Sequence, residues 1–172
     1  MSAAVTLVDV DEPTLDRLVH AAITDAAADE VTAPVTPGPA WSLARITWLR
    51  DLHRRCRTGL DGPAGQATWA IVADEEVVGA VRLKRTARPE ILETGSWLTR
   101  SARGRRLGGT AVAAVLREAV GLGAQGVRAE TTAANAPALG TLRWLGFHLK
   151  PDDDGTGVEA FLMFDAGCVT PG

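Results

Sequence analysis

The chain is predicted to fold as one α/β domain in which strands and helices alternate. Apolar runs of strand length, such as 91–98 and 126–132, are separated by amphipathic runs of helix length such as 108–122. A glycine-rich turn joins the first of these strands to that helix. With 172 residues, of which 46% are hydrophobic and 23% charged, the chain can bury one sizeable core.

The N-terminal third is expected to hold one strand and two helices. Residues 5–10 form the strand, and Asp11, Glu12 and Pro13 then open a helix, because an acidic cap followed by proline is typical of a helix start. Prolines make 32–40 a loop, and Ser42 caps a second helix through about Arg57. The core-facing stripes consist of Leu15, Leu18, Val19, Ala22 and Ile23 in the first helix and Ile46, Leu49, Leu52 and His53 in the second.

The rest of the chain is predicted to begin as a meander and to end as a hairpin. Residues 68–73 pair with 77–83 through the turn 74–76, and 91–98 extends the sheet. The later elements are a helix at 108–122, a strand at 126–132, a helix at 135–145, and two strands near 147–150 and 157–164. Residues 1–164 therefore form a single domain, and 165–172 a loose tail.

Composition excludes several classes of protein. The net charge of −3 argues against a nucleic-acid partner, and the absence of an apolar run of about 18 residues argues against a membrane role. Cys56 and Cys168 lack metal-ligand spacing, which favours free thiols, no metal and a cytoplasmic location. Only two lysines and no tyrosine occur, a bias that suggests a GC-rich bacterial genome.

The turn at 103–110 has the features of a phosphate cradle. Unpaired amides in the first turn of a helix and the positive end of its dipole favour an anion, and Arg103, Arg105 and Arg106 add formal charge. The alternative is an ordinary turn with solvated arginines. One strand later, a second pattern begins at Asn135 and ends at Gly146 and Phe147.

Together the two patterns resemble those of the GNAT superfamily of N-acetyltransferases. That family carries Q/R-x-x-G-x-G/A after a central strand and N-x-x-A/S-x-x-x-y/l-x-x-x-G-F about one strand later. The nearest subgroup is that of the ribosomal-protein N-terminal acetyltransferases. The resemblance implies a mixed, mostly antiparallel seven-stranded sheet with helices on both faces and central strands splayed around acetyl-CoA.

By the same resemblance, acetyl-CoA is the cosubstrate and no metal is needed. Its pyrophosphate is expected on the turn, its pantetheine arm along the end of the strand 91–98, and the helix cap Asn135 beside it. An amide at or near Leu98 would stabilise the oxyanion that develops on the acetyl carbonyl. The implied cofactor-binding residues are Trp97, Leu98, Thr99, Arg103, Gly104, Arg105, Arg106, Leu107, Gly108, Gly109, Thr110 and Asn135.

The chain departs from the family at three positions. Arg106 stands where the first glycine of the turn is usual, so it either grips a phosphate or obstructs the site. Leu142 stands where a tyrosine acid is frequent, and Ala138 where the subgroup has a serine. Water or the hydroxyl of Ser96, Thr131 or Thr132 must then protonate the thiolate, unless the thiolate leaves unprotonated.

Two carboxylates are the catalytic candidates. Glu93 lies ten residues before Arg103 on a central strand, where family members carry a glutamate base; the alternative is a structural acid paired with Arg82 or Arg128. Glu130 on the neighbouring strand is the second candidate. Trp41, Trp48, Trp69 and Trp144 are expected in the core.

The predicted activity is acetyl transfer from acetyl-CoA directly to a primary amine. Acidic residues flank 31–41 and 152–157, the segments that select the acceptor in this family, so a cationic amine is favoured. A small molecule, an antibiotic-like amine or a protein N-terminus would fit, and the protein would be a monomer or homodimer. The alternatives are a catalytically impaired CoA- or acyl-CoA-binding regulatory module of the same fold and a structural subunit with no ligand.

Overall fold

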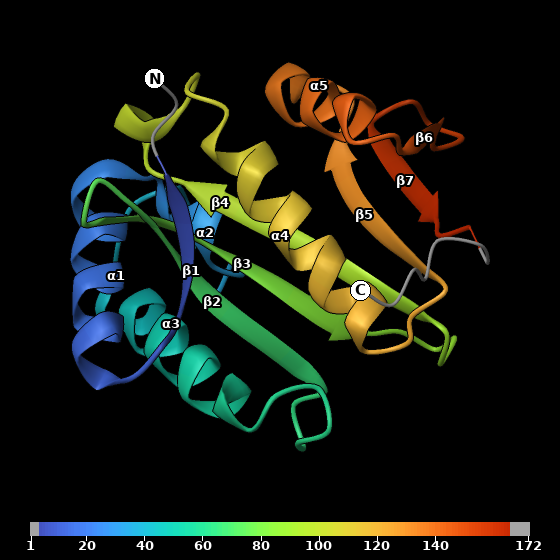
Figure 1. Cartoon of the computed structure of the whole chain (residues 1–172). Helices are drawn as coiled ribbons and strands as arrows, with labels where there is room; N and C mark the ends of the chain where they lie inside the picture. The colour runs from blue at the N-terminus through green and yellow to red at the C-terminus, as the bar shows by residue number, and fades with distance from the viewer. Residues whose placement is uncertain (1–3, 166–172) are drawn as a thin grey trace.

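The computed structural model describes residues 4–165 and has the predicted α/β architecture (Figure 1). The strands are β1 (Val5–Asp9), β2 (Gln66–Ala73), β3 (Glu76–Arg85), β4 (Ile91–Leu98), β5 (Gly126–Thr132), β6 (His148–Pro151) and β7 (Gly157–Met163). The helices are α1 (Glu12–Asp25), α2 (Ala28–Val31), α3 (Leu43–Arg55), α4 (Leu107–Gly121) and α5 (Ala136–Trp144), with short 3₁₀ turns at Cys56–Thr58 and Arg100–Ala102.

All seven strands form one mixed sheet in the order β1-β2-β3-β4-β5-β7-β6. Every neighbouring pair is antiparallel except β4 and β5, which are parallel and are joined through α4. The β2–β3 hairpin turns at Asp74 and Glu75, both of which have positive φ, as a two-residue turn of this twist requires. The parallel pair at the centre of the sheet is the feature that positions the site.

Helices cover both faces of the sheet, and each face has its own apolar cluster. One cluster joins α4 and the end of α5 to the inward side chains of β2 to β5, with Ile71, Leu83 and Val127 at its centre. The other packs α1 and α3 against the opposite side of β2 and β3 through Leu15, Leu18 and neighbours. Both predicted helix caps are confirmed: Asp11 accepts from the Thr14 amide and Ser42 from the Arg45 amide.

Three expectations for the N-terminal half need correction. Residues 28–31 form the short helix α2, which no periodic pattern marked. The helix α3 ends at Arg55, and a 3₁₀ turn replaces its expected last residues. Ile23 is exposed because it lies outside the buried stripe of α1, which consists of Thr14, Leu15, Leu18, Val19 and Ala22. The predicted tail, apart from Asp165, lies outside the described residues.

Candidate active site

The two central parallel strands separate halfway along their length. β4 and β5 are paired only at Ile91–Gly126, Leu92–Val127 and Glu93–Arg128, whereas β3 follows β4 to its end and β7 follows β5 to its end. Figure 1 shows the arrowheads of β4 and β5 well apart. The gap is a cavity of about 630 Å³, lined by residues of β4 and β5, the first two turns of α4 and α5, and Glu30 of α2.

The separation leaves main-chain groups of β4 without a strand partner. The Thr99 amide donates to the Val78 carbonyl at 2.8 Å, so in this antiparallel ladder the alternate residues of β4 point their amides and carbonyls to β3. Leu98 and Ser96 therefore point theirs away from β3, toward the place that β5 has left. Both residues line the cavity, so the open amides face it.

The turn that follows β4 delivers a helix N-terminus to the same cavity. Gly104 and Arg106 both adopt left-handed backbone conformations, with φ of 76° and 60°. Arg106 is the N-cap of α4, and no side chain caps that first turn, so the amides of Leu107, Gly108 and Gly109 have no intrahelical or side-chain acceptor. Gly108 lines the cavity. The left-handed φ explains why glycine suits position 106.

The three arginines of the turn do not converge on one point. Arg103 donates to Glu30 at 2.9 Å and to the Leu98 carbonyl at 3.1 Å, and Arg105 pairs with Asp74 at 2.7 Å. Among the ion pairs of the described residues, none involves Arg106. Sequence analysis expected all three cations to serve one polyphosphate. In this conformation Arg103 and Arg105 are paired with carboxylates, so Arg106 is the arginine of the turn that fits this expectation best.

The opposite wall of the cavity comes from α5. Asn135 caps this helix by accepting from the Ala138 amide at 3.2 Å, as its position predicted, and it also lines the cavity. Ala138 and the buried Leu142 line it too, so the two positions of the usual hydroxyls do face the gap. Four hydroxyl side chains line the cavity besides the buried Thr94, namely Ser96, Thr131, Thr132 and Thr141. Thr141 was missed because its only signal is helical adjacency to Leu142.

Glu93 lies on the α3 side of the sheet between two guanidinium groups. Its Oε1 accepts from Arg82 Nη2 at 3.0 Å, and its Oε2 lies 3.6 Å from Arg128 Nη1. The pairing that sequence analysis gave as the alternative is therefore present with both arginines. Glu93 is absent from the lining of the cavity between β4 and β5. Its carboxylate is held by the two guanidinium groups on the α3 side of the sheet.

Glu130 stands closer to the gap. Its side chain is 64% exposed, its carboxylate pairs with Arg128, and it lines the cavity between the strands. It also lines a second cleft, on the α3 side, with Trp48, Arg82 and Trp97. Glu30, Gly95, Ser96, Trp97 and Glu130 belong to both linings. The two hollows therefore meet where β4 and β5 part, so two reactants could approach one point from opposite sides.

Glu30 is a site residue that sequence reasoning missed. It lies on α2, and hydrogen bonding from Arg103 lowers the pKa of its carboxyl from the ordinary value, with a smaller contribution from the Ala27 amide. The only signal in the sequence was the acidic stretch that contains it. Nothing local shows that residue 30 reaches residue 103, because their contact depends on how the loop after α1 crosses the end of β4.

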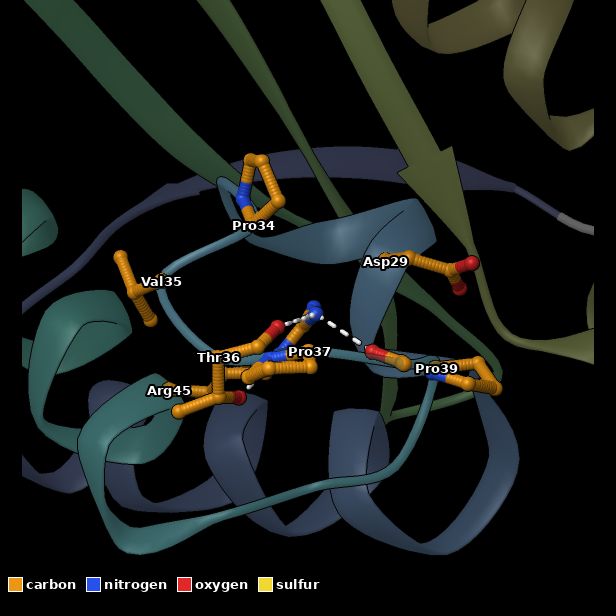
Figure 2. Close-up of a pocket in the computed structure, with 8 residues that line it drawn as sticks. Asp29, Pro34, Val35, Thr36, Pro37, Pro39 and Arg45 are labelled. Atoms are coloured by element: carbon orange, nitrogen blue, oxygen red, sulfur yellow. Dashed lines mark hydrogen bonds between the residues drawn. The ribbon is translucent and has the colours of Figure 1, made fainter.

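A buried arginine holds the loop that follows α2. Arg45 of α3 is only 1% exposed, and its guanidinium donates to Thr32 and Thr36 side chains and to the carbonyls of Thr36 and Gly38. Figure 2 shows the guanidinium pointing into the ring formed by this loop. Thr32 in turn donates to the Ala28 carbonyl. Arg45 thereby fixes the end of α2, the helix that carries Glu30.

His53 borders the second cleft, on the α3 side, but is a satisfied core residue. Its Nδ1 lies 2.9 Å from Thr68 Oγ1, and burial, with a smaller effect of Arg57, lowers its pKa from 6.5 to about 4. Within residues 4–165, no group of three or more His, Cys, Asp or Glu side chains could hold a metal ion. The same residues include no helix with the length and apolarity that a membrane span needs.

Comparisons with known proteins agree with this geometry. The model of the acetyltransferase (GNAT) domain matches residues 5–148. None of the curated proteins compared matches the chain. Similar solved structures include Mycobacterium smegmatis RimJ in complex with CoA-disulfide, which is 18% identical with a TM-score of 0.76 over 94% of this chain and 83% of that one.

Two further structures have the same fold. The GNAT domain of S. lividans PAT is 18% identical with a TM-score of 0.70, covering 94% of this chain and 90% of that one. RimL, described as a ribosomal L7/L12 alpha-N-protein acetyltransferase in complex with coenzyme A, is 14% identical with a TM-score of 0.71, covering 94% and 95%. RimJ and RimL have the type of fold that the two sequence patterns suggested.

Proposed function

The chain belongs to the GNAT acetyltransferase family, and on that premise we propose that it moves acetyl from acetyl-CoA directly to a primary amine. The observation that carries this proposal is the separation of β4 from β5. It opens amides of Leu98 and Ser96 into a cavity that meets a second cleft from the other face of the sheet. An acyl donor and an acceptor could therefore meet without a covalent enzyme intermediate.

We place the pyrophosphate of acetyl-CoA on the turn 103–110 and the pantetheine arm along Trp97, Leu98 and Thr99. The uncapped amides of α4 support this placement, because they carry the positive end of the helix dipole and need acceptors. Asn135 borders the same cavity from the other wall. The residues present suit this cosubstrate, and RimJ and RimL were solved with forms of CoA bound.

In the proposed reaction, the amine nitrogen attacks the thioester carbonyl, the C–N bond forms and the C–S bond breaks. The amide of Leu98 is the donor we assign to the developing oxyanion, a type of contact that can contribute about 10² to 10³ in rate. Holding both reactants at the junction of the two hollows supplies the proximity on which such a transfer depends.

We assign the base to Glu130 and a positioning role to Glu93. Glu130 borders both hollows, so it can accept the ammonium proton directly or through water. Glu93 pairs with Arg128, which also pairs with Glu130, so Glu93 acts through that guanidinium. The departing thiolate takes its proton from water or from one of the hydroxyls that line the cavity, namely those of Ser96, Thr131, Thr132 and Thr141.

The acceptor that fits best is a cationic primary amine. Glu30 and Glu130 both stand where the two hollows meet, and they present carboxylates to whatever enters from the α3 side. A carboxylate attracts an ammonium group more strongly in a confined cleft than in water. A protein N-terminus, an aminoglycoside-like polyamine and a small amino compound all carry the required group.

The competing function is a CoA-binding regulatory module that lacks turnover. The specific observation in its favour is that Ala138 and Leu142, which carry no hydroxyl, occupy the wall where the family places its acid. Titration calorimetry with acetyl-CoA, followed by a thiol-release assay with a panel of amines, separates the two. Binding together with amine-dependent release of CoA supports transfer. Binding without release from any amine supports the module, and no binding contradicts both.

A further inference from the structure

Trp144 is an exposed aromatic residue that lies against the turn 103–110. The sequence pattern placed it in the core, but its side chain is 65% exposed, whereas Trp41, Trp48, Trp69 and Trp97 are partly buried. A single exposed apolar residue needs no special explanation by itself. The location of this indole supplies the reason to consider a ligand.

The indole is held against the first turn of α4. A β-carbon added at Gly109 would lie 3.1 Å from Cζ3 and 3.4 Å from Cε3 of Trp144, so only glycine lets the ring approach this closely. Gly109 is one of the three residues of α4 with an uncapped amide. The ring is thus fixed beside the uncapped amides in the first turn of α4, and most of its surface remains exposed to solvent.

Trp144 does not line the central cavity, but it lies close to residues that do. Thr141, one helical turn before it, lines the cavity, and so does Gly108, the neighbour of Gly109. A cosubstrate with its acyl arm in the cavity and its pyrophosphate on α4 must place the attached nucleoside within a few ångströms of that turn. Arg106, at the start of the same turn, has no carboxylate partner within the described residues.

We propose that Trp144 is the stacking platform for the adenine of CoA. This inference rests on the proposed use of acetyl-CoA and adds the subsite for its nucleotide half. Stacking of a base on an aromatic side chain is worth about 1–3 kcal/mol, or roughly 5- to 150-fold in affinity. The platform would select CoA thioesters over shorter thioesters that lack the nucleotide.

The test compares CoA with acetyl-pantetheine, which lacks the nucleotide, by titration calorimetry. Trp144→Ala is expected to weaken CoA binding roughly 5- to 150-fold and to leave acetyl-pantetheine binding unchanged, while Trp144→Phe keeps most of the CoA affinity. Leu122→Ala, which removes an exposed side chain just beyond the far end of α4, is the matched control and should leave both affinities unchanged.

Each other outcome is decisive. Unchanged CoA affinity in Trp144→Ala overturns the platform. Equal weakening of both ligands also overturns it, because the indole would then only shape the cavity through Gly109. If the wild-type protein binds neither CoA nor acetyl-CoA, the proposed function itself fails, a result distinct from either outcome in the variant.

Discussion

At the scale of single residues, Arg106 combines a conformational cost with a proposed contact to the ligand. Its left-handed backbone costs an L-residue roughly 1–2 kcal/mol, part of which glycine would recover despite its larger chain entropy. Arg106→Gly should therefore raise the free energy of unfolding by roughly 0.5–1 kcal/mol in denaturant titrations. The same variant should weaken acetyl-CoA binding by about 1.5–3 kcal/mol through loss of a charge-assisted bond. Tighter binding would instead show that the arginine obstructs the site.

The proposed base makes a second prediction at the residue scale. Glu130→Gln should lower the rate of acetyl transfer by roughly 10² to 10⁴ with little change in acetyl-CoA affinity, because only proton transfer is impaired. Glu159→Gln is the matched control: Glu159 also contacts Arg128, at 3.4 Å, but lines neither hollow. Turnover unaffected by Glu130→Gln would return the role to Glu93, whose glutamine variant is the next to measure.

At the scale of elements, the first turn of α4 should not tolerate an anionic side chain. Gly108→Glu is expected to abolish acetyl-CoA binding, because a carboxylate would stand beside the amides to which we assign the pyrophosphate. Gly121→Glu, at the far end of the same helix where a side chain meets open space, should bind normally. Calorimetry on both variants, with circular dichroism to verify folding, makes the comparison. Normal affinity in folded Gly108→Glu would remove the turn from the site.

The same elements show how much of the secondary structure could be predicted from the sequence. β4 and β5 were predicted with the bounds they have, because apolar runs flanked by glycine and by polar breaks mark strands strongly. α2 was not predicted, because a four-residue helix presents no full period of its pattern. The cap Asn135 was predicted, since its signal is local, and its Oδ1 does accept from Ala138.

The site was predictable only where its residues lie together in sequence. The turn 103–110 is one continuous stretch of sequence, and so is the motif that starts at Asn135. Both border the cavity. The Glu30–Arg103 pair spans 73 residues and depends on the path of the loop that Arg45 holds, so no spacing rule could find it. The two-sided pairing of Glu93 depends on register across three strands, which is why its role was left between base and structural acid.

At the scale of the whole molecule, stability should fall as pH drops from about 6.5 to about 4 because of one buried residue. His53 joins α3 to β2, and burial lowers its pKa from 6.5 to about 4, so the native state keeps it neutral while the unfolded chain takes up a proton. More protons on the unfolded state mean that the free energy of unfolding decreases with falling pH through this window, by roughly 3 kcal/mol in total. Hydrogen bonds from Arg54 and Arg57 lower the pKa of Glu12 from 4.5 to about 2, so its contribution to stability is lost as the pH falls from about 4.5 to about 2.

Urea unfolding followed at several pH values tests this expectation. The wild-type protein should lose stability steadily between pH 6.5 and 4, and His53→Gln should show a much shallower slope because glutamine carries no titrating group into the core. His20→Gln, a change at an exposed histidine of α1, should keep the wild-type slope. Because His53 also lines the cleft on the α3 side, its protonation in the folded protein should open the α3–β2 contact beneath that cleft, so acetyl transfer should fail as the pH falls to about 4. A wild-type profile that is flat from pH 6.5 to 4 would mean that the imidazole is charged in the folded protein, and that α3 packs on the sheet without the dry contact on which the lowered pKa depends.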